Sequence, residues 1–290
     1  MTEQLSANPA TETISRTPAD VSITPRNLDF DIEKLLTTDW LRDDPFATAF
    51  FNALSIMFPV GEQQFIESVK HYRDRISDPV LVAHVKGFTA QESIHRREHQ
   101  KYNEALCASR GYPLDRLEAP IRKRIDWAQS HMPPIVHLAA TVAYEHWTAI
   151  LADALLRRPE MMQGAAPEMA ALWRWHAIEE SEHKAVAFDV YRSVGGTVAM
   201  RRRLMLIVTV EFFWDALRHM RLMLRDHKGS KMKLWLGGMR FLFGKGGALR
   251  GLGRPWLDFF RRDFHPWDHD NRAIVATVAR ELSLNPQPAE

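Results

Sequence analysis

The stretch from Trp173 to Phe188 combines two histidines and a glutamate at helical spacing. His176, Glu180 and His183 stand at positions i, i+4 and i+7, so a helix would project two imidazoles and a carboxylate from one face. Imidazole and carboxylate groups are ligands for iron, manganese and zinc. The pattern therefore predicts a metal-binding face on this helix.

A second motif of this kind lies earlier in the chain, where Glu92 and His95 stand at i and i+3 on one side of a helix. Two Glu-x-x-His matches alone carry little weight, because chance produces such pairs in a chain of 290 residues. Two further glutamates, Glu62 and Glu145, each lie on the helix-like segment directly before one of the motifs. One Glu from each of two helices and one Glu-x-x-His from each of two others is the ligand pattern of ferritin-like bundles that hold two metal ions.

Long segments with helical periodicity carry these candidate ligands, and strand patterns are sparse, so the sequence predicts an all-α fold with a ferritin-like four-helix bundle. The first helix is expected to begin after the capping residue Asp44 and to bend or break near Pro59. A crossover with a short helix over 113–131 would connect the second helix to the third. The expected long helices cover residues 44–77, 79–109, 134–158 and 167–193.

The four glutamates are expected to meet in the middle of this bundle. At about 1.5 Å of rise per residue, Glu62 and Glu92 lie at similar depth in one hairpin, and Glu145 and Glu180 do so in the other. Two like unit charges about 4 Å apart repel by about 4 kcal/mol at an effective dielectric constant of about 20. Two divalent cations would cancel the charge of four carboxylates, and the inward helix faces offer no Lys or Arg for this purpose. The alternative is that these are separate, solvated groups on surface helices.

Other polar residues share the faces that carry the candidate ligands. We expect His84 and His99 to stand behind the ligands or to be ordinary core histidines, and Glu179 and Glu182 to stand behind the ligands or in solvent. The helix that carries Glu145 is lined by small residues. They would leave space beside the metal ions for oxygen or a substrate, or would simply allow close helix packing.

Length and composition limit the remaining possibilities. The 290 residues are 46% hydrophobic, enough for a buried core, and the single cysteine, Cys107, fits a reducing compartment. Residues 1–25 hold no secretory signal and no apolar run reaches the length of a membrane span, so we expect a cytoplasmic protein. The expected organisation is a disordered or extended tail over 1–40, a metal-binding bundle over 41–195, a basic aromatic helical extension packed on it over 196–275, and a tail over 276–290.

The C-terminal extension differs in charge from the rest of the chain. Residues 198–262 contain 15 Lys and Arg against 4 Asp and Glu, in a chain whose formal net charge is +2. Aromatic residues such as Trp214 and Trp235 lie between these cations. The segment is typical of helices that lie on an anionic membrane surface, here the inner face, or that bind an acidic protein or a lipid-like substrate; alternatively, it packs on the bundle with its Arg face in solvent. No nucleic-acid-binding motif accompanies the charge, so we expect no nucleic-acid partner.

Several segments resemble a known family. FPVGEQQFIESVKHYR, FTAQESIHRREH, YEHW, WHAIEESEHKAVAFDVY and FHPWDHD are similar to the bacterial family of predicted metal-dependent hydrolases, over most of residues 40–270. The metal pattern, with a histidine four residues before the last Glu, also resembles the di-iron enzymes of the p-aminobenzoate N-oxygenase group. This second resemblance implies the following ligand sets: Glu62 and His95 on one metal ion, Glu145, His176 and His183 on the other, and Glu92 and Glu180 bridging.

Three candidate functions follow from the motifs and the resemblance. In the first, two iron ions activate O2 to oxidise or oxygenate a small organic or lipid-like substrate. Mn or Zn suit the same ligands, and a redox-inert pair would instead lower the pKa of a bridging water for hydrolysis. The third is a non-catalytic metal-binding bundle. The long basic extension argues against metal storage.

Overall fold

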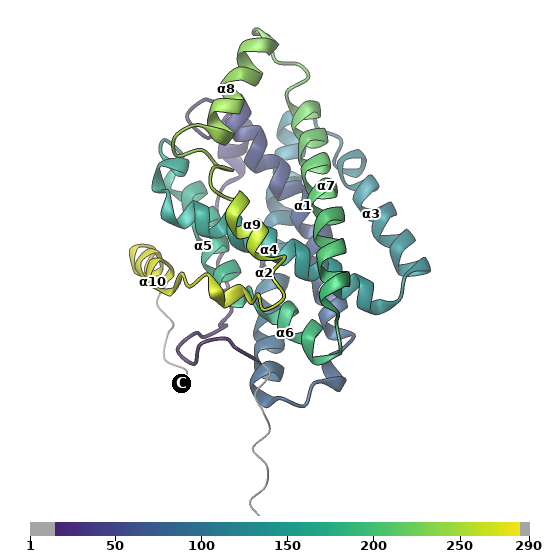
Figure 1. Ribbon diagram of the computed structural model, residues 1–290. Coiled ribbons are helices and arrows are strands. Elements are labelled where there is room, and N and C mark those ends of the chain that lie inside the picture. The colour runs from purple at the N-terminus through teal and green to yellow at the C-terminus, as the bar shows by residue number, and fades with distance from the viewer. Residues whose placement is uncertain (1–14, 285–290) are drawn as a thin grey trace, which may run out of the picture.

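The computed structural model describes residues 15–284, and within them all regular secondary structure is helical (Figure 1), which confirms the predicted all-α fold. The core consists of two packed helix pairs. The first is α1 (Pro45–Lys70) with α2 (Pro79–Arg110), and the second is α4 (Pro134–Arg157) with α5 (Pro167–His183), which α6 (Val186–Ser193) continues. Contacts between α1 and α4 and between α2 and α5 join the pairs into a bundle.

The two helices of the first pair begin in the same way. Asp44 Oδ1 accepts hydrogen bonds from the backbone N–H groups of Phe46 and Ala47, and Asp78 caps α2 through the N–H groups of Val80 and Leu81. A proline occupies the first turn of both helices, where its missing N–H costs nothing. The predicted start of both helices is therefore correct.

Of the bend or break predicted near Pro59, the break is wrong, because α1 continues through this residue. A proline inside a helix leaves the carbonyl four residues earlier without its N–H donor. Here that carbonyl belongs to Ser55, and it accepts a hydrogen bond of 2.9 Å from Asn103 Nδ2 on α2. A side chain of the neighbouring helix thus replaces the lost bond. The helix ends at Lys70, earlier than predicted, and a short 3₁₀ turn precedes α2.

The predicted helix over 167–193 is interrupted after His183, where α5 ends, and α6 begins at Val186. Near this break, Ser181 Oγ donates to the Ala177 carbonyl at 2.8 Å, a type of bond that bends helices. The break is also tied to the C-terminal part of the chain. Lys184 Nζ donates to the Asn271 side chain at 2.8 Å.

Further helices cover the bundle from outside. Helix α7 packs on α1 and α4, α3 packs mainly on α1, and α10 packs on α5. Their bounds are α3 Leu114–His131, α7 Val198–Met223, α8 Lys231–Phe243, α9 Gly253–Asp258 and α10 Arg272–Glu281; the 3₁₀ helices are η1 Glu33–Thr37, η2 Arg73–Arg75, η3 Pro159–Met162 and η4 Pro266–Asp268. Helix α10 extends into the expected tail over 276–290, of which 285–290 lie outside the described residues. No helix within 15–284 is long and apolar enough to cross a membrane.

The N-terminal segment lies against the bundle. Residues 15–32, part of the expected tail over 1–40, have no helix and run past α2 and α5, whereas residues 1–14 lie outside the described part. At Gly87 on α2, any Cβ would clash with the backbone of Ile23. The glycine therefore permits close approach of this segment to α2.

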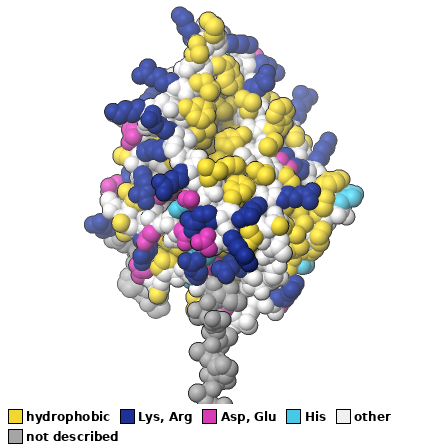
Figure 2. Space-filling model, in the orientation of Figure 1, with side chains coloured by type: hydrophobic (Ala, Val, Ile, Leu, Met, Phe, Trp, Pro, Cys, Tyr) yellow, Lys and Arg dark blue, Asp and Glu magenta, His cyan; other side chains and the backbone are white. Residues whose placement is uncertain are grey.

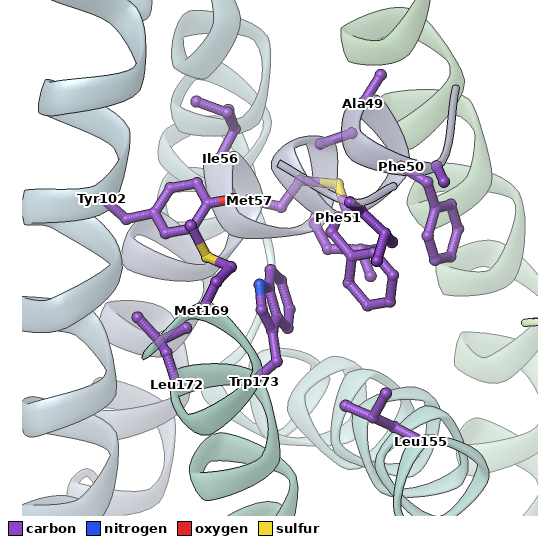
Figure 3. Close-up of a cluster of buried hydrophobic side chains, with 14 of the residues drawn as sticks. Ala49, Phe50, Phe51, Ile56, Met57, Tyr102, Leu155, Met169, Leu172 and Trp173 are labelled. Carbon is purple, nitrogen blue, oxygen red and sulfur yellow. The ribbon is translucent and has the colours of Figure 1, made fainter. Parts of the chain in front are cut away.

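Two apolar clusters fill the two ends of the bundle. One contains an aromatic group around Phe51, Tyr102 and Trp173 (Figure 3), and the other contains Phe65 and Phe88. Between them, each core helix carries its candidate metal ligands. The polar residues therefore lie near the middle of the bundle, enclosed by apolar layers.

Candidate metal centre

All the predicted ligands lie together inside the bundle, and none is more than 4% exposed. Each comes from the helix on which the sequence pattern predicted it: one glutamate from α1, a Glu-x-x-His pair from α2, one glutamate from α4, and three residues from α5. They are Glu62, Glu92, His95, Glu145, His176, Glu180 and His183.

Their ligand atoms form two neighbouring sets. Glu62, His95 and His176 each offer an atom within 4.8 Å of the others, and so do Glu92, Glu145 and His183. A third group with the same spacing, Glu92 with His95 and Glu180, connects the two. This arrangement suits two adjacent metal ions.

The grouping of His176 differs from the one that the resemblance implied. His176 lies with Glu62 and His95, and its ring stacks on that of His95 with centroids 4.2 Å apart. Seven residues of helix separate His176 from His183, which is about 10 Å along the axis. Their Nε2 atoms nevertheless converge, because both lie within 3.5 Å of the same oxygen of Glu180.

Glu180 lies between the three imidazoles. Its Oε1 is 3.0 Å from His176 Nε2, 3.5 Å from His183 Nε2 and 3.6 Å from His95 Nδ1. One oxygen therefore contacts histidines of both sets.

Each of the three imidazoles has one ring nitrogen that faces the candidate ligand glutamates. The other ring nitrogen is held by a residue outside the ligand set. His95 Nε2 donates to Glu179 Oε2 at 2.9 Å, and His183 Nδ1 donates to Gln91 Oε1 at 3.0 Å. His176 Nδ1 lies 2.7 Å from His99 Nε2. Outer partners of this kind fix the tautomer and orientation of histidines that bind metals. The inner nitrogens are left to face the carboxylates.

The partners of His95 and His183 are joined by one arginine. Arg26, from the extended N-terminal segment, donates to Glu179 at 3.1 Å and to both oxygens of Glu182 at 2.6 and 2.8 Å. The Gln91 amide donates to Glu182 at 2.9 Å. A continuous chain of hydrogen bonds thus runs from one imidazole to the other. Arg26 and Gln91 are absent from the predicted site, and Glu182 was predicted to lie either here or in solvent.

His99, the residue that contacts His176 from behind, is itself held by polar partners. His99 Nδ1 lies 2.9 Å from Ser55 Oγ, which donates to Asn103 Oδ1 at 2.7 Å. His99 therefore stands behind a candidate ligand. His84 does not: it is half-buried, and its ring lies 3.4 Å from the Ser15 hydroxyl on the N-terminal segment.

The carboxylates have the properties of ligands that lack a cation. Both side-chain oxygens of Glu62, Glu92 and Glu145 are buried without a hydrogen-bond partner, and no Lys or Arg within residues 15–284 forms an ion pair with them. Burial raises the pKa of Glu62 and Glu145 well above the usual value, and the neighbouring carboxylates raise it further. Such groups are costly in a protein interior unless a cation neutralises them. The residues present therefore fit a pair of divalent metal ions.

The surroundings shift the pKa values of the three candidate ligand histidines in opposite directions. The carboxylates around His183 raise its pKa well above the usual value, and those around His95 raise its pKa to about 10, in both cases against the effect of burial. Burial and the nearby His95 instead lower the pKa of His176 to about 4. For Glu180, the surrounding imidazoles hold the pKa well below its usual range although burial alone would raise it. Without a metal, protons on two imidazoles would thus partly balance the glutamates.

One small apolar cavity adjoins the cluster, and a larger cavity shares two of its lining side chains. The smaller, of about 50 Å³, is lined by His176 and Glu180 together with aromatic and aliphatic side chains. The larger, of about 240 Å³, lies between α1, α3, α4 and α7. Phe58 and Thr148 line both. A molecule in the larger cavity would therefore be separated from the candidate metal ligands by these two side chains and the smaller cavity.

The fold and the site define an all-helical protein with a buried cluster of His and Glu that could hold metal ions. Residues 24–270 match the family of predicted metal-dependent hydrolases, and the chain belongs to this family. No curated protein and no solved structure matches the chain.

Proposed function

We propose that this protein is an enzyme that uses two divalent metal ions, bound by the buried glutamates and histidines of α1, α2, α4 and α5. The observation that carries the proposal is the set of buried carboxylates without a partner, next to imidazoles whose inner nitrogens face them. Glu62, His95 and His176 would hold one ion. Glu92, Glu145 and His183 would lie around the other, and Glu92 and Glu180 would bridge the two.

Hydrolysis is the reaction that the description of the family supports. Divalent ions in this cluster would act as Lewis acids and lower the pKa of a water molecule between them. The protein contributes a site shielded from bulk water and imidazoles fixed by Glu179, Gln91 and His99. The large cavity would hold an apolar part of the substrate, with the bond to be cleaved directed past Phe58 and Thr148.

Oxidation of a substrate by O2 is the second candidate, and the smaller cavity favours it. Apart from His176, Glu180 and Thr148, its lining is aromatic or aliphatic, and its volume of about 50 Å³ suits a small apolar molecule such as O2. Iron is the metal that this chemistry requires, and three imidazoles with four carboxylates are suitable ligands for it.

One experiment distinguishes the two reactions. The metal-free protein is loaded anaerobically with Fe(II) and mixed with O2 while absorbance and Mössbauer spectra are recorded. In parallel, protein loaded with Zn or Mn is assayed on p-nitrophenyl esters of increasing chain length. Oxidation of both irons with a transient visible band supports O2 chemistry, and turnover of esters only with Zn or Mn supports hydrolysis. If fewer than two ions bind per chain under every condition, the dinuclear centre is refuted.

A further inference from the structure

A band of exposed apolar side chains runs along the outer helices. Figure 2 shows it extending from α8 over α7, with Lys and Arg on its flanks. The members on α7 lie on one face of the helix. No other element of residues 15–284 covers this face. They are Leu206, Ile207, Val210, Trp214 and Leu217, and α8 and α9 add Met232, Leu236, Met239, Phe243 and Leu257. Contiguous patches of this kind mark interaction sites on proteins that otherwise avoid them.

The charge around this apolar band has one sign. Within residues 198–262, 13 Lys and Arg are exposed, whereas Asp226 is the one exposed carboxylate. A second copy of the chain meeting the same face would bring these cations together, which is unfavourable. The occupant of this face must therefore be anionic at its surface and must accept apolar side chains.

We propose that the apolar band and its basic flanks dock on an anionic lipid bilayer, and that the enzyme takes a lipid-like amphiphile from it. A bilayer offers both properties in the required order: negative head groups at the level of the Lys and Arg side chains, and a hydrocarbon interior below them for the apolar ones. Long basic side chains can keep their charge among head groups while their stems lie along the apolar surface. Trp214, 64% exposed, is a residue type typical of this interface.

The large cavity lies between the docking face and the smaller cavity beside the metal centre. Trp127 and Met132 line the cavity and are exposed, so the cavity reaches the surface between α3 and the start of α4. Ile207 lines the same cavity and belongs to the apolar band on α7. Docking would thus place the mouth of the cavity at the bilayer. The apolar lining behind it fits a hydrocarbon chain, and this choice of substrate rests on the proposed function.

Vesicle sedimentation tests the docking. The full chain is centrifuged with vesicles of phosphatidylcholine alone and with vesicles that also contain phosphatidylglycerol. We expect binding to the anionic vesicles, at least about tenfold weaker for V210D and for the double variant K231E/K233E. Val80→Asp and Lys70→Glu are the matched controls, because these residues are exposed on other faces, and both should bind like the unsubstituted protein. Equal binding of all variants, or no binding to anionic vesicles, overturns the proposal; self-association lost in V210D would identify a second copy as the occupant.

A second measurement separates the substrate from the docking. cis-Parinaric acid, a fluorescent fatty acid, should bind the metal-free protein in solution, and A140F, which fills the large cavity, should lose this binding while still sedimenting with vesicles. Unchanged parinaric acid binding in A140F overturns the proposed substrate class. Both assays use metal-free protein and no turnover. Their outcome is therefore independent of whether the metal centre performs the proposed chemistry.

Discussion

At the scale of single residues, the cost of the buried glutamates requires a compensating charge. An ionised carboxylate in a protein interior is unfavourable by several kcal/mol unless it is paired. Glu62, Glu92 and Glu145 have no hydrogen-bond partner for either side-chain oxygen. Arg26 is partly buried nearby, but its charge is directed to Glu179 and Glu182. His183 lies 3.1 Å from Glu92 and 3.6 Å from Glu145, and one imidazole cannot balance three carboxylates, so metal ions best explain the set.

The proposed bridging role of Glu180 leads to the first prediction. Glu180→Ala removes the oxygen that contacts His95, His176 and His183, and we expect the bound metal to fall from two ions per chain to one or none. Metal content after dialysis is measured by plasma mass spectrometry. Glu168→Ala, at an exposed position of the same helix, is the control and should retain two ions. Two ions retained in Glu180→Ala would show that Glu180 does not bridge.

Metal binding should release protons. The carboxylates around His95 raise its pKa to about 10, so this ring holds a proton near pH 7 in the metal-free protein, and the raised pKa values of Glu62, Glu145 and His183 act in the same direction. A metal ion binds only their deprotonated forms, so its affinity should increase as pH rises from 6 to 8. Calorimetric titrations in buffers of different ionisation enthalpy count the protons. A binding enthalpy that is the same in all buffers would contradict the prediction.

At the scale of elements, the helical pattern predicted most of the core but not its interruptions. Glutamate and histidine spacing placed the four segments correctly because a helix fixes which residues share a face. The continuity of α1 through Pro59 depends on Asn103, a residue 44 positions away. The break between α5 and α6 likewise involves Asn271. Contacts between distant residues are not contained in a local pattern.

The N-terminal segment shows the same limit at the site. Nothing in its composition, which is typical of a disordered tail, indicates that Arg26 reaches Glu179 and Glu182. The sequence gives one indication of such a partner. Two further glutamates, Glu179 and Glu182, stand on α5 beside the buried candidate ligands. Charge balance there requires a cation, but the sequence does not show which of its 38 Lys and Arg residues supplies it.

Arg26 should orient ligands rather than bind metal. We expect Arg26→Gln to weaken metal binding by about 10- to 100-fold, because partners of metal-binding histidines contribute about this much. Competition with a chelator measures the affinity. Arg26→Lys keeps the positive charge but not the two hydrogen bonds to Glu182. Its metal affinity should therefore lie between those of the unsubstituted protein and Arg26→Gln.

A control for this prediction lies on the same segment. Arg16 is half-exposed and pairs with Asp268, away from the cluster, so Arg16→Gln should leave the affinity unchanged. If Arg26→Gln and Arg16→Gln both bind metal like the unsubstituted protein, the N-terminal segment has no role in positioning the histidines.

At the scale of the whole molecule, charge is divided between inside and outside. The buried centre concentrates carboxylates, whereas the outer helices α7 to α9 present cations around an apolar band. Negative charge at the centre is suited to metal ions, and positive charge outside is suited to an anionic surface. The formal net charge of +2 conceals both features, because they cancel in the total.

The buried centre should also set how stability depends on pH. His95 has a pKa of about 10 in the folded protein, so the folded state binds more protons than the unfolded state above pH 7, and the raised pKa values of Glu62, Glu145 and His183 act in the same direction. Stability of the metal-free protein should therefore fall as pH rises from 7 to 9, by about 1.4 kcal/mol per pH unit for each such proton. This corresponds to about 2–4 °C in Tm per kcal/mol.

Metal loading should abolish this dependence, because the ligands are then deprotonated in the folded state. Burial lowers the pKa of Lys184 to about 7, which makes stability rise with pH instead. This effect is the same with and without bound metal, so it cancels in the difference between the two forms. Thermal unfolding is followed by circular dichroism from pH 7 to 9, with and without bound metal. The Tm values of the metal-free and metal-bound forms should diverge as pH rises. Glu62→Gln should reduce the slope of Tm against pH in the metal-free form, whereas Glu67→Gln, at an exposed position of the same helix, should not. Parallel Tm curves would mean that these buried groups carry no protons for a metal ion to displace.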